Sequence, residues 1–129
     1  MGADLRKSGR RRREALVSAA AALLAEGGFA AISHRAVAER AGLPLAATTY
    51  YYRLRDELVR HAFARVVQRE LRAWRGALAG LRGAHDAAAA ADLLVGVLCP
   101  TDAEVRARQL ALWELYLQAG RDGSSKWPL

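Results

Sequence analysis

The sequence predicts an all-α protein, and three observations lead to this fold class. The chain has 129 residues, of which 53% are hydrophobic, so it is long and apolar enough to bury a core. Only three residues are proline, whereas alanine and leucine, which favour helices, are abundant. Apolar residues recur at helical spacing in several segments, and no alternating pattern typical of β-strands recurs. We therefore expect helices throughout, connected by turns.

A basic segment precedes the first predicted helix. Residues 1–13 contain six basic side chains and one acidic one, and we expect residues 1–12 to form a flexible arm. Taken alone, the composition of such an arm fits a solubilising tail as well as a DNA-binding segment. Beside a DNA-binding motif, the arm can enter the minor groove through Arg10, Arg11, Arg12 and Arg13. The helix is predicted from about Arg12 to Glu26, because one face gathers Leu16, Ala19, Ala20, Leu23 and Leu24.

Residues 33–51 have the pattern of a helix-turn-helix. Ser33 is expected to cap a short amphipathic helix, because its hydroxyl can accept a hydrogen bond from the first turn. Gly42 then supplies the turn, since glycine readily adopts a positive φ, and Pro44 begins a second helix that runs to about Tyr51. In this motif the second helix lies in the major groove of DNA.

The second helix of the motif carries small, uncharged side chains that can approach base edges closely. Its exposed side is expected to hold Ala46, Ala47, Thr48 and Thr49. Threonine offers both a hydroxyl and a methyl group, and the methyl group suits thymine. The helix is flanked by arginines that can hold phosphates on either side, namely Arg35, Arg40, Arg53 and Arg55.

A long fourth helix is predicted to begin near Leu54 or Arg55 and to run past Trp74. Acidic residues in its first turn suit the helix dipole, and its length makes it a rod that can join two modules. A fifth helix is predicted at about residues 84–98. Cys99, which follows it, is expected to be a buried small hydrophobe.

The sixth predicted helix opens with a capping box, T-x-x-E, at residues 101–104 and ends at Gly120. One face is expected to hold Val105, Gln109, Leu112 and Tyr116, and the next face Leu110, Trp113 and Leu117. Residues 121–129 show no periodicity, so we predict an irregular tail there.

Charge and residue types limit the function classes. The formal net charge is +7 and the isoelectric point is about 10.5, which favours a polyanionic partner such as nucleic acid. The three histidines lie far apart and lack cysteine partners, so we expect no metal and no other cofactor. No arrangement typical of a catalytic site occurs, so the protein is not expected to be an enzyme. No apolar run approaches the ~20 residues that span a bilayer, and we expect a cytoplasmic protein without a membrane partner.

Three segments follow one another in a specific order, and a long helix comes directly after them. They are the helix REALVSAAAALLAEGGF, the segment SHRAVAERAGL and the run ATTYYYRLRDEL. In this order they resemble the N-terminal DNA-binding region of the TetR family of bacterial transcriptional regulators. The resemblance covers about residues 13–71, and the chain departs from the usual pattern of the family at Pro44, Thr49, Tyr52 and Arg55.

The resemblance implies both the organisation of the chain and its DNA contacts. It implies a helix-turn-helix domain at residues 13–53 and an incomplete effector and dimerisation region at residues 54–120, because family members are commonly longer. Tyr52 is implied to lie in the core. With the flanking arginines, the candidate DNA-binding residues are Ser33, His34, Arg35, Leu45, Ala46, Ala47, Thr48, Thr49, Tyr50, Tyr51, Arg53 and Arg55.

The resemblance further implies a ligand-responsive repressor that binds double-stranded DNA, at a palindromic operator, as a homodimer. A small-molecule effector would bind among the C-terminal helices, where the candidate pocket residues are Trp74, Gln109, Trp113 and Tyr116. Aromatic residues at this spacing are also typical of a plain core. A second hypothesis is a helical protein-interaction module, or a truncated regulator with little DNA binding of its own, whose apolar helices pair with another chain.

Overall fold

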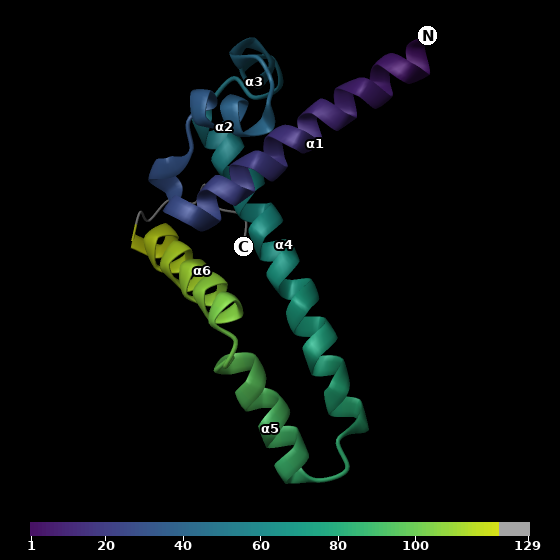
Figure 1. Cartoon of the computed structure of the whole chain (residues 1–129), viewed down its shortest axis with the longest axis vertical. Coiled ribbons are helices and arrows are strands. Elements are labelled where there is room, and N and C mark those ends of the chain that lie inside the picture. The colour runs from purple at the N-terminus through teal and green to yellow at the C-terminus, as the bar shows by residue number, and fades with distance from the viewer. Residues whose placement is uncertain (122–129) are drawn as a thin grey trace.

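The computed structural model describes residues 1–121, and within that range the chain forms six α-helices, two short 3₁₀ helices and no strand. The all-α prediction is confirmed. The first three helices and the start of α4 form a head, and the rest of α4 leaves the head as a rod (Figure 1). The chain turns at the foot of this rod, and α5 and α6 return along it towards the head (Figure 1).

Helix α1 spans Gly2–Gly27 and is therefore longer than expected. The predicted flexible arm is the first part of this helix, and it projects from the head (Figure 1). Arginine, lysine, alanine and leucine all favour helix, and once a helix has formed, each added residue extends it easily. Gly9, which lies within this part, does not stop it. The helix ends at Gly28, which has a φ of 72°.

The helix-turn-helix forms as predicted. Helix α2 spans His34–Ala41, and the hydroxyl of Ser33 accepts a hydrogen bond of 3.1 Å from the N–H of Ala36. Gly42 has a φ of 64°, the left-handed conformation that ends α2 and that glycine adopts without strain. Helix α3 spans Leu45–Tyr51, so Pro44 caps this helix instead of beginning it.

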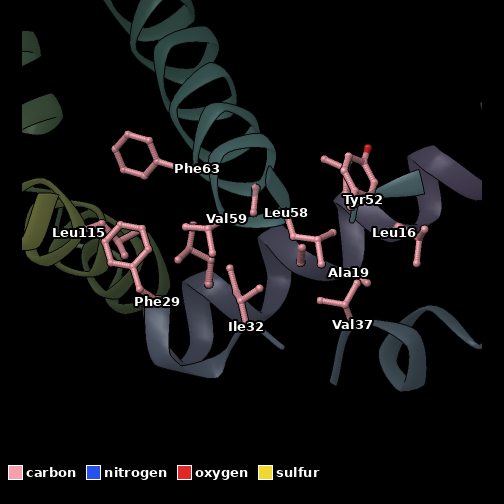
Figure 2. Packing of buried hydrophobic residues seen from close by; sticks show 14 residues of the cluster. Leu16, Ala19, Phe29, Ile32, Val37, Tyr52, Leu58, Val59, Phe63 and Leu115 are labelled. Carbon is pink, nitrogen blue, oxygen red and sulfur yellow. The ribbon is translucent and has the colours of Figure 1, made fainter. Parts of the chain in front are cut away.

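A single apolar cluster holds the head together (Figure 2). Helix α1 contributes small and medium side chains, and α4 packs against it with Leu58, Val59, Ala62 and Phe63. The 3₁₀ helix η1, Phe29–Ala31, supplies Phe29, whose ring centre lies 6.0 Å from that of Phe63. Leu115 of α6 belongs to the same cluster, so the last described helix is part of the core of the head.

Helix α4 spans Arg55–Ala79, as predicted, and the 3₁₀ helix η2, Gly80–Gly83, follows it. Helix α5 spans Ala87–Leu98 and begins three residues later than expected, because the carboxylate of Asp86 caps it by accepting a hydrogen bond of 2.8 Å from Ala89. Cys99 is exposed, so the prediction of a buried thiol was wrong. The C-terminal part of α5 is exposed, since Val95 and Leu98 are each 60% exposed.

Helix α6 spans Ala103–Arg121. Its cap is Asp102, whose carboxylate accepts a hydrogen bond of 2.9 Å from Val105. The cap thus lies one residue later than predicted, and valine at this position cannot complete a capping box. The buried face holds Gln109, Leu112 and Leu115, while the exposed large side chains are Val105, Leu110, Trp113 and Leu117. Apart from Arg121, the predicted tail lies outside the described residues. No helix in residues 1–121 is long and apolar enough to cross a membrane.

Candidate nucleic-acid interface

The outer face of α3 is uncharged and open to solvent. Leu45 is 47% exposed and Tyr50 is 79% exposed, and Ala46 and Thr49 lie between them on the exposed side. Ala47 is half-buried. The structure thus presents three of the predicted base-reading side chains together on one short helix, and this face projects at the end of the head (Figure 1).

Thr48 was predicted to read bases, and the structure contradicts this. Its side chain is fully buried, and its hydroxyl donates a hydrogen bond of 2.7 Å to the carbonyl of Leu45. The reason is helical geometry, because residues four apart share a face and Tyr52, four residues later, is in the core. Tyr52 was expected to lie in the core, which is confirmed, and this expectation already implied that Thr48 is buried.

The position next to it, Thr49, is exposed. Its hydroxyl donates to the carbonyl of Ala46 at 3.2 Å, so its methyl group is the part left to meet a base. Such a bond is weak at the surface and can be exchanged for a contact with DNA. Of the two threonines, only Thr49 is exposed on the outer face of α3, so it stays a candidate for base contact.

His34 has an internal partner. Its Nε2 atom lies 2.8 Å from the backbone carbonyl oxygen of Tyr52, and the side chain is half-buried. The ring therefore donates a hydrogen bond that ties the start of α2 to the end of α3. In this position it holds the two helices of the motif in place and does not reach out as a free phosphate donor.

Arg55 is also engaged inside the head. Its Nε donates to the carbonyl of Ile32 at 2.7 Å, and its guanidinium also bonds the carbonyl of Phe29. These carbonyls belong to the segment between α1 and α2, where the carbonyl of Phe29 also accepts a hydrogen bond of 3.3 Å from the N–H of Ile32. Arg55 is exposed and thus has a structural role beside its expected phosphate contact. The sequence gives no signal for this structural role, because the partners lie more than twenty residues away.

The other flanking arginines, which were expected to hold DNA phosphates, differ in their surroundings. Arg35 and Arg53 are exposed on either side of α3. Arg40, in contrast, makes a two-point ion pair with Glu26 on α1, with distances of 2.8 and 2.6 Å. This pairing lowers the pKa of the Glu26 carboxyl, chiefly through the hydrogen bonds from Arg40.

The tyrosines at 50, 51 and 52 divide as predicted, with one ring inside. The rings of Tyr50 and Tyr51 meet edge to face with centres 5.0 Å apart. Tyr51 is half-buried, and the guanidinium of Arg13 lies 5.6 Å from its ring centre. The contact between Arg13 and Tyr51 was not predicted, since it joins α1 to α3. Arg10, Arg11 and Arg12 are exposed on the projecting part of α1.

A separate hollow of about 310 Å³ lies among α4, α5 and α6. Of the predicted pocket residues, Trp74 and Gln109 line it, whereas Trp113 and Tyr116 do not. Tyr116 packs on Phe63 with ring centres 5.7 Å apart, and Trp113 is 49% exposed. The sequence analysis missed the charged residues of the wall, which are Glu70, Asp92 and Arg108.

Gln109 fixes one side of this hollow. Its amide Nε2 donates to the carbonyl of Val97 at 3.2 Å, which joins α6 to α5. The residue is only 7% exposed. Among residues 1–121 no cluster of three or more metal-ligating side chains occurs.

The chain is similar to known proteins in both sequence and structure. Residues 16–62 match the family model of bacterial regulatory proteins of the tetR family. A crystal structure of a candidate transcriptional regulator from Streptomyces coelicolor A3(2) is similar, with a TM-score of 0.69 and 31% sequence identity. The match covers 86% of this chain and 62% of that one, so the chain spans less than two thirds of its relative. A search of curated proteins gave no significant match. Residues 16–62, which comprise the helix-turn-helix and the start of α4, therefore form an N-terminal domain of the tetR family of bacterial regulatory proteins.

Proposed function

We propose that the protein is a DNA-binding transcriptional regulator that acts as a ligand-responsive repressor. The observation that carries this proposal is the exposed, uncharged face of α3, formed by Leu45, Ala46 and Thr49 at the end of the head. A helix with small side chains can enter the major groove and touch base edges without an electrostatic penalty. Arg35 and Arg53 beside it supply phosphate contacts that set its register.

The protein acts as a homodimer on a palindromic operator in this proposal. Two recognition helices would then lie about 34 Å apart, one turn of DNA, and read two half-sites. Exposed apolar side chains on α5 and α6 support self-association, because surfaces of this kind are usually covered in an assembly; they are Leu94, Val95, Leu98, Leu110, Trp113 and Leu117.

The effector is proposed to bind in the hollow among α4, α5 and α6. Its wall combines the indole of Trp74 with charged groups of both signs, Asp92 and Arg108 among them. A small molecule with an apolar body and a polar end suits such a wall. The effector releases DNA if it binds the form with wrongly spaced heads more tightly, since only differential affinity shifts a population.

Selection of duplexes from a randomised pool, combined with the mass of the chain in solution, tests the proposal. We expect a dimer that enriches sequences with two-fold symmetry. The double variant Ala46→Asp/Thr49→Asp should lose this enrichment, because two carboxylates would face the DNA, while Glu39→Gln on the neighbouring helix should keep it. A chain that enriches no sequence contradicts the proposal. That result would favour an interaction module, which the same exposed apolar side chains on α5 and α6 would serve.

A further inference from the structure

The projecting part of α1 is held by α3. The hydroxyl of Tyr51 lies 3.4 Å from the position that a Cβ of Gly9 would occupy, which is ordinary van der Waals contact, so Tyr51 packs beside the helix at Gly9. The guanidinium of Arg13 lies over the same ring. An isolated helix of about twelve residues is marginal in water, and these contacts give residues 2–13 a tertiary partner.

Three arginines on this segment share one face. Arg6, Arg10 and Arg13 are spaced i, i+4 and i+7, which places them in a row along the helix. The row borders a hollow of about 600 Å³ whose wall holds these arginines with Ala3, Gly9 and Tyr51, and no acidic side chain. Three guanidinium groups around an open hollow attract an anion strongly.

A second hollow, of about 440 Å³, lies on the other side of Arg13 and Tyr51. Its wall includes Arg60, His61 and Tyr52, together with Glu57, whose carboxylate accepts a hydrogen bond of 3.4 Å from the N–H of Leu54. The Tyr52 hydroxyl is buried and has no hydrogen-bond partner among residues 1–121. A buried hydroxyl without a partner costs free energy, and this one lies in the same wall as Arg60 and His61.

We propose that these two hollows, which we call the Tyr51 groove, bind consecutive phosphates of a DNA strand outside the bases that α3 contacts. The proposal rests on the proposed function. Arg6 and Arg13 are separated by about 10 Å along the helix, so their guanidinium groups can meet different phosphates of one strand. The bound segment stays helical. A helix with side chains is about 10 Å wide and cannot enter a minor groove of about 6 Å, so the contacts are to the backbone and not to the minor groove expected for a flexible arm.

The dependence of DNA affinity on salt tests the groove. The full chain is titrated with mixed-sequence duplex DNA at several salt concentrations. The variant Arg6→Gln/Arg10→Gln should reduce the slope of log K against log salt by about 1.8, because each lost phosphate contact removes about 0.9. The control Arg72→Gln/Arg75→Gln removes the same charge from exposed positions of α4 and should leave the slope unchanged.

A second pair of variants tests whether the segment acts as a helix. Gly9→Pro keeps every charge but breaks the helix before the core, and it should reduce the slope by about as much as Arg6→Gln/Arg10→Gln. Gly9→Ala, which keeps the helix, should retain the wild-type slope. Circular dichroism should show that Gly9→Pro loses only a few residues of helix.

Three results would overturn the groove. They are a wild-type slope for Arg6→Gln/Arg10→Gln, an equal loss for the control pair, or a wild-type slope for Gly9→Pro, which would mean that an unfolded arm makes the contacts. These failures leave sequence selection by α3 intact. If the wild-type chain binds no duplex at any salt concentration, both the groove and the proposed function are wrong.

Discussion

The imidazole Nε2 of His34, the first residue of α2, lies 2.8 Å from the carbonyl oxygen of Tyr52, the residue that ends α3. This hydrogen bond closes the helix-turn-helix, because it joins the beginning of one helix to the end of the other. Both recognition helix and turn are short, with seven residues in α3. A short helix depends on tertiary contacts for its stability.

Replacing His34 by alanine should lower the free energy of unfolding by about 1 kcal/mol, the usual net contribution of one hydrogen bond. Urea denaturation measures this change. DNA affinity should also fall, since α3 would be less well held. Arg35→Ala, at an exposed position of the same helix, is the control and should change stability by less than about 0.5 kcal/mol. Equal stabilities for the two variants would contradict the structural role of His34.

Replacing Arg55 by alanine should cost more, about 2 kcal/mol, because it leaves the carbonyls of Phe29 and Ile32 without their charged donor. Arg55→Lys should fall between wild type and Arg55→Ala, since an ammonium group cannot reproduce the two-point geometry of a guanidinium. Thermal unfolding distinguishes the three proteins. If Arg55→Ala keeps wild-type stability and only weakens DNA binding, Arg55 contacts phosphate and not the loop.

The two threonines of α3 should behave differently. Thr49→Ala removes an exposed methyl and hydroxyl and should change which sequences are enriched from a randomised pool. Thr48→Val removes only a buried hydroxyl bonded to Leu45, and should change stability by no more than about 1 kcal/mol while leaving the sequence preference unaltered. A changed preference in Thr48→Val would place Thr48 at the DNA.

The ion pair between Glu14 on α1 and Arg65 on α4 predicts a dependence of stability on pH. The hydrogen bonds from Arg65 lower the pKa of the Glu14 carboxyl from its ordinary value of 4.5. A carboxyl whose pKa is lower in the folded state stabilises the fold above its unfolded pKa, and this contribution is lost as the pH falls through the folded pKa.

Glu14→Gln should therefore be less stable than wild type near neutral pH by a small amount, because the carboxylate is 60% exposed and solvent screens the pair. The difference in stability should disappear well below pH 4.5, where Glu14 of the wild type is protonated and therefore uncharged, like glutamine. Thermal unfolding at several pH values measures it, with Glu39→Gln as the control at an exposed position. A difference that persists in acid would show that the charge of Glu14 is not its cause.

Leu115 extends the core of the head to α6. Its side chain is 3% exposed, and Leu115→Ala should lower the free energy of unfolding by about 3 kcal/mol, as in other buried leucine truncations. Leu117→Ala, at a position 60% exposed, should have little effect. The measurement is urea denaturation followed by the fluorescence of Trp74 and Trp113. A single transition is expected, because the head and the C-terminal helices share one core.

Local signals in the sequence predicted most of the fold. The cap at Ser33, the positive φ at Gly42 and the start of α4 at Arg55 each depend on a few neighbouring residues, and all are confirmed. The helix-turn-helix followed from them. Propensity alone also favoured helix for residues 2–12, and the charge of that segment outweighed it in the prediction of a flexible arm.

The site was predicted less well, because its details depend on contacts between distant parts of the chain. Arg55 donates hydrogen bonds to carbonyls that precede it by 23 and 26 residues, and no pattern in the sequence predicts such a partner. The effector hollow takes Trp74 and Gln109 but not Tyr116, because Tyr116 turns towards Phe63 in the head. Periodicity alone predicts two adjacent apolar faces on α6. Packing against the rest of the protein decides which of these faces is turned towards α4.

Helix α1 packs on both α4 and α6, and its N-terminal part continues well past the last buried turn. This makes it a lever whose pivot lies in the core and whose N-terminal part contacts Tyr51 of α3. From the middle of its buried section to Arg6 is about 21 Å, so a tilt of about 5° displaces the N-terminal part by about 2 Å. A small tilt of α1 in the core is therefore magnified at Arg6 and Arg10.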